Sequence, residues 1–236
     1  MKKLIKVAVN DFKLVFRDKS LNFFFIFPVI NLFVVRYGLP YLVEAIPVLQ
    51  NYVPIILMFV ANQGALIFGF IYSMVLIDEK DTNVAKVYGI MPISKFWFVI
   101  FRLIAPYLLA VSATFLVFLV EPYFKLSVVV NLVYSALAGL IAPVMVLFVA
   151  ILAKNKLEAM TWQKLFNIPI TLPVLAFFVP AAFSFVFAIF PTHWAYQGFS
   201  HLITGKNYFL YFFIGYIFNL LLIAFLARKF AKNHFQ

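Results

Sequence analysis

The sequence contains no cysteine, so disulfide bonds, thiolate metal sites and a cysteine nucleophile are all excluded. Charged residues are also scarce: they make up 11% of the 236 residues, whereas about 25% is usual in soluble domains. Hydrophobic residues account for 66% of the chain, which is more than a soluble core of this size can enclose. These proportions exclude a cytoplasmic enzyme, a nucleic-acid-binding domain and a disordered chain. We therefore expect an all-α membrane protein.

Long apolar segments define the expected spans. A helix needs about 20 apolar residues to cross about 30 Å of hydrocarbon. Six segments meet this requirement: 21–42, 52–77, 96–120, 128–153, 166–190 and 208–227. They take up most of the chain and leave no room for a soluble catalytic domain. We expect a single transmembrane domain over residues 1–236.

The basic residues indicate which side of the membrane each loop faces. Lys and Arg number 19 and Asp and Glu number 8, which gives a formal net charge of +11. With six spans, sixteen basic residues fall on the side of both termini, and three fall on the other side: Arg36, Lys125 and Lys206. Because cytoplasmic loops carry the excess of Lys and Arg, we expect both termini in the cytoplasm and the loops 121–127 and 191–207 outside. Topology thus explains the basic excess without nucleic acid as a partner.

A separate amphipathic helix is expected before the first span, over residues 2–19. At about 100° per residue, its apolar side chains gather on one side and its polar side chains on the other. The apolar set is Leu4, Ile5, Ala8, Val9, Phe12, Val15 and Phe16, and the polar set is Lys6, Asn10, Lys13 and Arg17. A helix with these two faces lies in the membrane interface instead of crossing it. The alternative is a basic topogenic tail that happens to be helical.

Two segments depart from a simple row of spans. The inner segment 78–95 has helix-start residues at Asp81–Asn83 and a helix stop at Pro92, which predicts a short helix parallel to the membrane. The expected fifth span, 166–190, contains three prolines, and these predict a broken helix with a part that turns back near the outer face: Pro169, Pro173 and Pro180.

Motifs for catalysis and nucleotide binding are missing. The sequence has no G-x-x-x-x-G-K-[ST] signature, so the chain cannot hydrolyse ATP by itself. It has no H-E-x-x-H, no G-x-S-x-G and no paired carboxylates within a span, so we expect no catalytic residue, no metal and no cofactor. His193 and His201 share one outer loop with Trp194 and are interpreted as interfacial polar residues. No Asp or Glu falls in the middle of a span, which weakens a proton- or sodium-driven carrier.

Neutral amides are the polar groups expected inside the spans. Asn62, Gln63 and Asn131 are candidates for a translocation path, and the first two lie near the middle of the second span. The alternative is hydrogen bonding between helices, worth about 0.6–2 kcal/mol per bond. Both interpretations stay open at this point.

Three segments, in this order, resemble the membrane subunit of a type 2 ATP-binding-cassette (ABC) exporter. Residues 10–28 (NDFKLVFRDKSLNFFFIFP) are similar to the interfacial elbow helix of that family running into its first span. Residues 79–95 are similar to its E-K-E-x-G-T…P-[IV]-S-[RK] segment, with Asp81 in place of the second Glu and Asn83–Val84 in place of Gly-Thr. Residues 166–194 are similar to its proline-broken fifth span, which is followed by short re-entrant outer helices and ends in P-x-x-W.

The resemblance implies a permease in which two subunits, identical or paired with a homologue, bind two cytoplasmic ATPases. The first and fifth spans would face the twin subunit, and glycines in the spans mark places where helices can approach closely: Gly64, Gly69, Gly139 and Gly215. The inner segment would carry the helix that docks on the ATPase, with these coupling residues: Glu79, Lys80, Asp81, Thr82, Asn83, Lys86 and Pro92.

The expected function is therefore ATP-driven export across a bacterial cytoplasmic membrane. An apolar interior with few charges favours a lipid-like, drug-like or hydrophobic peptide substrate. One alternative is an ATP-independent carrier or lipid scramblase. Another is a small intramembrane enzyme, and the missing catalytic constellation weakens this alternative.

Overall fold

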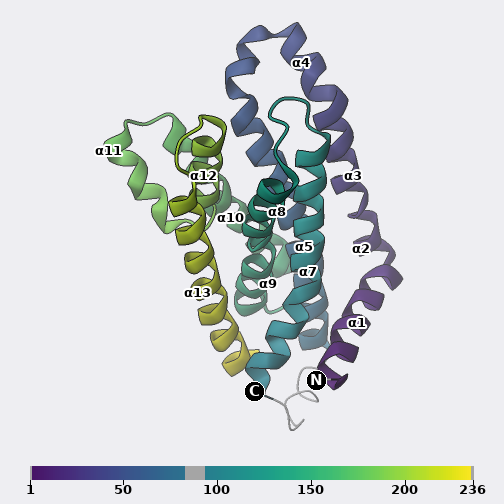
Figure 1. The fold of residues 1–236 in the computed structure, drawn as a ribbon. Coiled ribbons are helices and arrows are strands. Elements are labelled where there is room, and N and C mark those ends of the chain that lie inside the picture. Colours follow the sequence, from purple (N-terminus) through teal and green to yellow (C-terminus); the bar gives the residue numbers. More distant parts are fainter. Residues whose placement is uncertain (1, 83–93, 235–236) are drawn as a thin grey trace.

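The computed structural model describes residues 2–82 and 94–234, and every regular element within these ranges is helical. The long helices form an upright bundle, in which α1 and the C-terminal end of α13 lie at the same end (Figure 1). Five segments of the described chain are long and apolar enough to cross a membrane: Leu21–Ala45, Pro47–Asp81, Lys95–Val120, Val128–Leu152 and Phe209–Lys232. They match five of the six predicted spans, with ends that differ by no more than five residues.

The N-terminal region forms a separate helix followed by the first candidate span. Helix α1 covers Lys2–Arg17, as the amphipathic pattern predicts. The first span joins α2 (Lys19–Phe23), α3 (Ile26–Phe33), a π-helical turn (Val34–Gly38) and α4 (Leu39–Ala45). Arg36 lies in the π-helical turn, and its Nη1 donates to the Val120 carbonyl over 3.4 Å.

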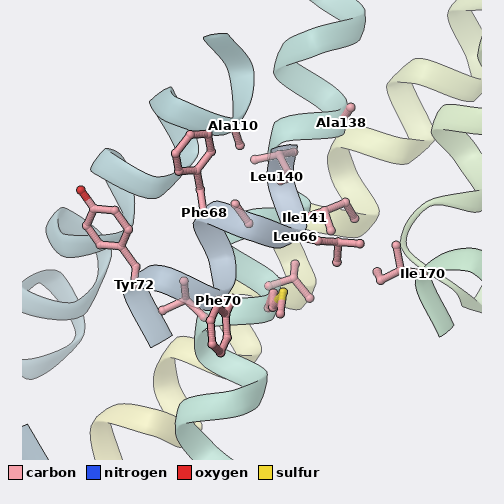
Figure 2. Packing of buried hydrophobic residues seen from close by; sticks show 14 of the residues in the cluster. Leu66, Phe68, Phe70, Tyr72, Ala110, Ala138, Leu140, Ile141 and Ile170 are labelled. Carbon is pink, nitrogen blue, oxygen red and sulfur yellow. The ribbon is translucent and has the colours of Figure 1, made fainter. Parts of the chain in front are cut away.

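Helix α5 (Val53–Asp81) forms the centre of the bundle. It follows a 3-10 helix (Pro47–Tyr52) and packs against α7 (Lys95–Val120) and α9 (Ile141–Leu152). Every residue from Phe68 to Ile77 is buried, so α5 is covered on all sides over this stretch. Figure 2 shows side chains of α5 packed with residues of the surrounding helices, among them Ala110, Leu140 and Ile170. A helix that is apolar all round and fully covered is typical of the core of a membrane bundle.

Glycines allow the closest of these helix contacts. A Cβ atom on Gly64 of α5 would lie 2.7 Å from the Cβ of Ala113 in α7. A Cβ atom on Gly139, at the end of α8 (Val128–Gly139), would lie 2.6 Å from Val111 Cγ2. Small residues at such positions let helix backbones approach closely. The predicted close approaches are therefore confirmed as contacts within one subunit.

The predicted fifth span is divided into several short pieces. It begins within α10 (Lys156–Thr171) and continues through a 3-10 helix (Leu172–Phe177), α11 (Ala181–Ser184) and a second 3-10 helix (Phe185–Ile189). Proline lacks the backbone N–H and disrupts a helix interior, and all three predicted prolines sit at these junctions or one turn before them: Pro169, Pro173 and Pro180. Helices α12 (His193–Ile203) and α13 (Phe209–His234) complete the chain.

Two helix boundaries differ from the sequence prediction. Helix α10 starts ten residues before position 166, because Asn155 Oδ1 caps it by accepting from the Glu158 backbone N–H over 2.9 Å. Helix α5 continues to Asp81 and is followed by its C-cap Thr82, where the sequence predicted the start of a separate helix. The rest of that predicted helix, including Asn83, Lys86 and Pro92, lies outside the described residues.

Candidate functional site

The last turn of α5 carries four consecutive charged residues, and the first three contact three different neighbouring helices. Asp78 pairs with Lys156 Nζ of α10 over 2.6 Å, and Glu79 pairs with Arg102 of α7. The third residue, Lys80, reaches the end of α9. Successive helix residues point about 100° apart, so one turn reaches several neighbours at once. We refer to Asp78, Glu79 and Lys80 as the charged turn of α5.

Lys80 caps the end of α9. Its Nζ donates to the carbonyl of Ala150 and, over 3.1 Å, to the carbonyl of Ala153. The last carbonyl groups of a helix lack partners within the helix and attract a cation. Lys80 therefore holds the ends of α5 and α9 together, at the point where the chain turns toward α10.

Glu79 belongs to a buried cluster of three ionised side chains. Arg102 Nε and Nη2 donate to the two carboxylate oxygens of Asp11 over 2.5 and 2.9 Å. Arg102 Nη1 and Nη2 donate to the two oxygens of Glu79 over 2.7 and 2.8 Å. The Arg102 guanidinium carbon also lies 5.4 Å from the ring centroid of Phe98. One planar guanidinium thus joins α1, α5 and α7; we call Asp11, Glu79 and Arg102 the ion triad.

The ion triad is almost completely removed from solvent. The exposed fractions are 2% for Asp11, 7% for Glu79 and 4% for Arg102. Burial raises the pKa of the Asp11 carboxyl, and the adjacent Arg102 guanidinium opposes that rise. Each carboxylate accepts with both oxygens, which is the geometry of an ionised group on a bidentate guanidinium. The triad therefore holds a fixed arrangement of three helices.

An open recess of about 550 Å³ lies beside the charged turn, between α1, α5 and α10. Side chains of both charge signs line it together with apolar ones; the polar members include Asn10, Arg17, Asp18, Asp78 and Lys156. The hydrogen bond to Asp78 raises the pKa of the Lys156 ammonium group. The polar recess, the ion triad and the charged turn all lie at one end of the bundle.

The predicted path residues have different surroundings. Asn62 is buried, and its Nδ2 donates to the Tyr196 hydroxyl over 2.6 Å. Asn131 is also buried; its Nδ2 donates to the Phe115 carbonyl over 3.1 Å, and its Oδ1 accepts from Ser135. Gln63 is half-buried and makes no hydrogen bond within the described part of the chain. Two of the three amides therefore join helices, as the structural alternative proposed.

Among residues 2–82 and 94–234, no group of three or more His, Asp or Glu side chains could hold a metal ion.

Comparison with known proteins identifies the protein family to which this helical bundle belongs. The family model described as fluoroquinolones export permease protein Rv2686c-like matches residues 11–227. This chain belongs to that family. The matched region contains the whole ion triad, the charged turn and all five candidate spans up to Ala227.

Two curated relatives are similar over almost their full length. They are the fluoroquinolones export permease proteins MT2760 and Rv2686c, from Mycobacterium tuberculosis strains CDC 1551 / Oshkosh and ATCC 25618 / H37Rv. Each is 25% identical over 239 residues, which cover 95% of this chain and 92% of the relative. No solved structure matches the chain.

Membership in an export permease family confirms the resemblance to an exporter membrane subunit. The chain is a multi-helix membrane protein of an export permease family.

Sequence reasoning missed two members of the ion triad. The charge count places Arg102 among the sixteen basic residues of the cytoplasmic side, and neither face of the predicted amphipathic helix includes Asp11. Two signals could have found them. Arg102 lies six residues inside the predicted span 96–120, and Asp11 is the one acid in residues 2–17. Charges in an apolar environment normally find an opposite charge.

Proposed function

We propose that this chain is the membrane subunit of an ABC exporter that moves a drug-like molecule of the fluoroquinolone type out of the bacterial cytoplasm. The observation that carries this proposal is membership in an export permease family with full-length relatives named for fluoroquinolones. Of the three substrate classes that the sequence favours, these names support the drug-like one. An apolar bundle with few charges suits a planar, amphipathic molecule better than a sugar or an ion.

A separate cytoplasmic ATPase supplies the energy in this proposal. The resemblance to type 2 exporters supports it, as does the missing phosphate-binding signature. The buried carboxylates of Asp11 and Glu79 already accept from Arg102 with both oxygens. That arrangement suits a permanent contact between helices better than the exchange of a coupling proton.

The proposed topology has six crossings with both termini in the cytoplasm. Lys156, at the start of α10, contacts Asp78 in the last turn of α5. Phe178, after the 3-10 helix, lies 6.2 Å by ring centroid from Tyr52 at the other end of α5. Residues 156–178 thus run along the length of α5, which supports a sixth, proline-broken crossing. The short pieces α11 and 185–189 then form the re-entrant outer part.

The proposed assembly contains two permease subunits, and the first span lies at their interface. Within its most apolar stretch only 11% of the residues are buried in one subunit, against 67% for the span containing α5. Many of the exposed side chains of this span are large and apolar; Ile26, Val29, Ile30 and Phe33 are examples. A second subunit or lipid must cover such a surface, and the type 2 resemblance favours the subunit.

The site residues have distinct proposed roles. Gln63 is the path residue, because its amide makes no hydrogen bond within the described chain while Asn62 and Asn131 join helices. On the side of the ATPase, the coupling residues are the exposed end of α5 and the segment after it: Asp81, Thr82, Asn83, Lys86 and Pro92. Glu79 and Lys80 connect that end to the rest of the bundle.

Transport by the purified complex tests this function. The permease, reconstituted with its ATPase in proteoliposomes, is expected to move a fluorescent fluoroquinolone only when ATP is present on the ATPase side. A matched control uses a partner ATPase in which the carboxylate required for ATP hydrolysis is replaced. Equal transport without ATP, or with the inactive partner, would instead identify an ATP-independent carrier. ATP-driven movement of labelled phospholipid without fluoroquinolone transport would reject the substrate assignment.

A further inference from the structure

The ion triad connects the two ends of the inner segment that follows α5. Glu79 lies two residues before the end of α5 at Asp81, and Arg102 lies seven residues after the start of α7 at Lys95. The two side chains bind each other through two hydrogen bonds, at 2.7 and 2.8 Å. The ends of α5 and α7 are thereby held together independently of the residues between them.

The same guanidinium extends this connection to α1. Asp11 lies on the side of α1 that faces the bundle, one turn before the fully buried Val15. Phe12 and Phe16, on the other side, remain exposed to the surroundings of the bundle. Helix α1 is thus fastened to the bundle by one buried carboxylate, and the apolar side chains around it leave Asp11 no alternative cation among the residues that line its cavity.

Stability alone does not account for a buried cluster of this kind. Removing three charges from water is costly, and well-packed apolar side chains of similar size often stabilise a fold equally well. A guanidinium with two bidentate carboxylates instead fixes the distance and orientation of the helices that carry them. The triad therefore fixes the relative positions of α1, α5 and α7 at the end of the bundle that carries the charged turn.

We infer that Arg102 is a positioning residue for energy coupling. Its side chain makes α1 and the last turn of α5 move as one unit. This inference rests on the proposed function, because it assigns a route by which movement at the α5 end reaches the membrane-facing helix α1. Lys80 and Asp78 connect the same turn to α9 and α10, so four helices meet at one turn of α5. Arg102 provides the connection to α1.

The test measures drug export per ATP hydrolysed in proteoliposomes that contain the full permease and its ATPase. Asp11→Asn leaves a balanced Arg102–Glu79 pair and removes the charge that holds α1. We expect normal binding of the ATPase and normal basal hydrolysis, with export per ATP lowered about threefold or more. Arg102→Lys keeps the charge but cannot bind two carboxylates in a bidentate manner, so it should lower the same ratio. Asp11→Glu should restore part of it.

Matched controls separate this role from a merely structural one. Lys13→Gln removes a charge from the exposed side of α1, two residues away, and should leave export per ATP unchanged. A structural role predicts fewer folded complexes, each with the wild-type ratio; that result for Asp11→Asn would overturn the inference. An unchanged ratio in both Asp11→Asn and Arg102→Lys would overturn it as well. Failure of the wild-type complex to export with ATP would instead reject the proposed function.

Discussion

Asn62, in the N-terminal half of α5, donates a hydrogen bond over 2.6 Å to the hydroxyl of Tyr196 in α12. Both side chains are buried, and the bond joins the central helix to an outer helix 134 residues away in the sequence. Two further bonds hold the start of α12: Thr192 Oγ1 donates to the Ile170 carbonyl over 2.7 Å, and Asn219 donates to the Pro191 carbonyl over 3.1 Å. Polar side chains thus fasten a proline-rich segment that cannot form one continuous helix.

The Asn62–Tyr196 bond predicts a difference between two neighbouring amides. Asn62→Leu leaves the Tyr196 hydroxyl buried without its partner and should lower the stability of the fold by about 0.6–2 kcal/mol. Thermal unfolding in mild detergent measures this. Gln63→Leu is the control, because Gln63 is half-buried and makes no hydrogen bond in the described chain. Its stability should stay near that of wild type while the proposed export activity changes. Equal loss of stability in both variants would contradict the assignment of Gln63 to the path and Asn62 to packing.

Removing the cation of the ion triad should be far more harmful than removing one anion. Arg102→Gln leaves two buried carboxylates facing each other and should cost about 3–5 kcal/mol. Asp11→Asn leaves a balanced ion pair and should cost about 1–2 kcal/mol. Thermal unfolding and the yield of folded protein measure the difference. In the triple variant Asp11→Asn/Glu79→Gln/Arg102→Met no buried charge remains, and much of the loss should be recovered. A triple variant less stable than Arg102→Gln would show that the charges themselves stabilise the fold.

The outer end of the bundle should become less stable in acid. Burial lowers the pKa of His193 to about 4, against about 6.5 in an unfolded chain. His193 is also the first residue of α12, where a positive charge opposes the helix dipole. Because the folded state disfavours the protonated ring, the stability from neutral His193 is fully present above about pH 6.5 and is lost as pH falls toward about 4.

Unfolding temperatures at about pH 7.5 and about pH 4.5 test whether stability falls in acid as predicted. The wild type should lose several degrees, and His193→Phe, which keeps a ring but cannot be protonated, should lose less. His201→Gln is the control and should retain the wild-type drop, since His201 is only half-buried near the end of α12. An equal drop in His193→Phe and wild type would assign the acid sensitivity to other groups.

How far the sequence predicts this structure depends on whether a feature is local. Apolar length alone located five candidate spans within five residues, and periodicity located α1, because both signals are carried by neighbouring residues. Apolar length did not locate the start of α10, because its first turns contain the charged residues Lys156, Glu158 and Lys164. Asn155 nevertheless caps a helix there. The ion triad was missed because Asp11 and Arg102 are 91 positions apart, and only the tertiary fold brings them together.

In the candidate site, too, the sequence predicted local features and did not predict contacts between distant residues. The family resemblance pointed to a coupling segment within residues 79–95, but it offered no reason to expect that Glu79 and Lys80 would bind other helices of the same chain. The charged turn of α5 combines both roles: it leads into the proposed docking segment and holds α7, α9 and α10. The amides also needed the structure, since Asn62 and Gln63 are adjacent in sequence yet face different surroundings.

The proposed orientation can be tested because the chain contains no cysteine. Single substitutions Lys125→Cys and Lys206→Cys place thiols at exposed positions of the two expected outer loops. Both should react with a membrane-impermeant thiol reagent in intact cells. Lys154→Cys, exposed between α9 and α10 on the expected inner side, should react only after the cells are permeabilised. Labelling of Lys154→Cys in intact cells would reverse the orientation, and labelling of Lys125→Cys without labelling of Lys206→Cys would remove the sixth crossing.

The exposed face of the first span predicts where two subunits meet. Ile26, Val29, Phe33 and Tyr37 follow one another at helical spacing and are 48%, 49%, 60% and 67% exposed in one subunit. In a two-fold dimer, residues near the axis lie close to their own copies, so one thiol per chain is enough to link the pair. Cysteine at one or more of these four positions should yield dimers with a short thiol cross-linker in membranes. Leu132→Cys, 52% exposed on α8, is the matched control and should remain monomeric on a denaturing gel. Cross-linking at Leu132 but at none of the four positions would move the interface to the exposed face of α8.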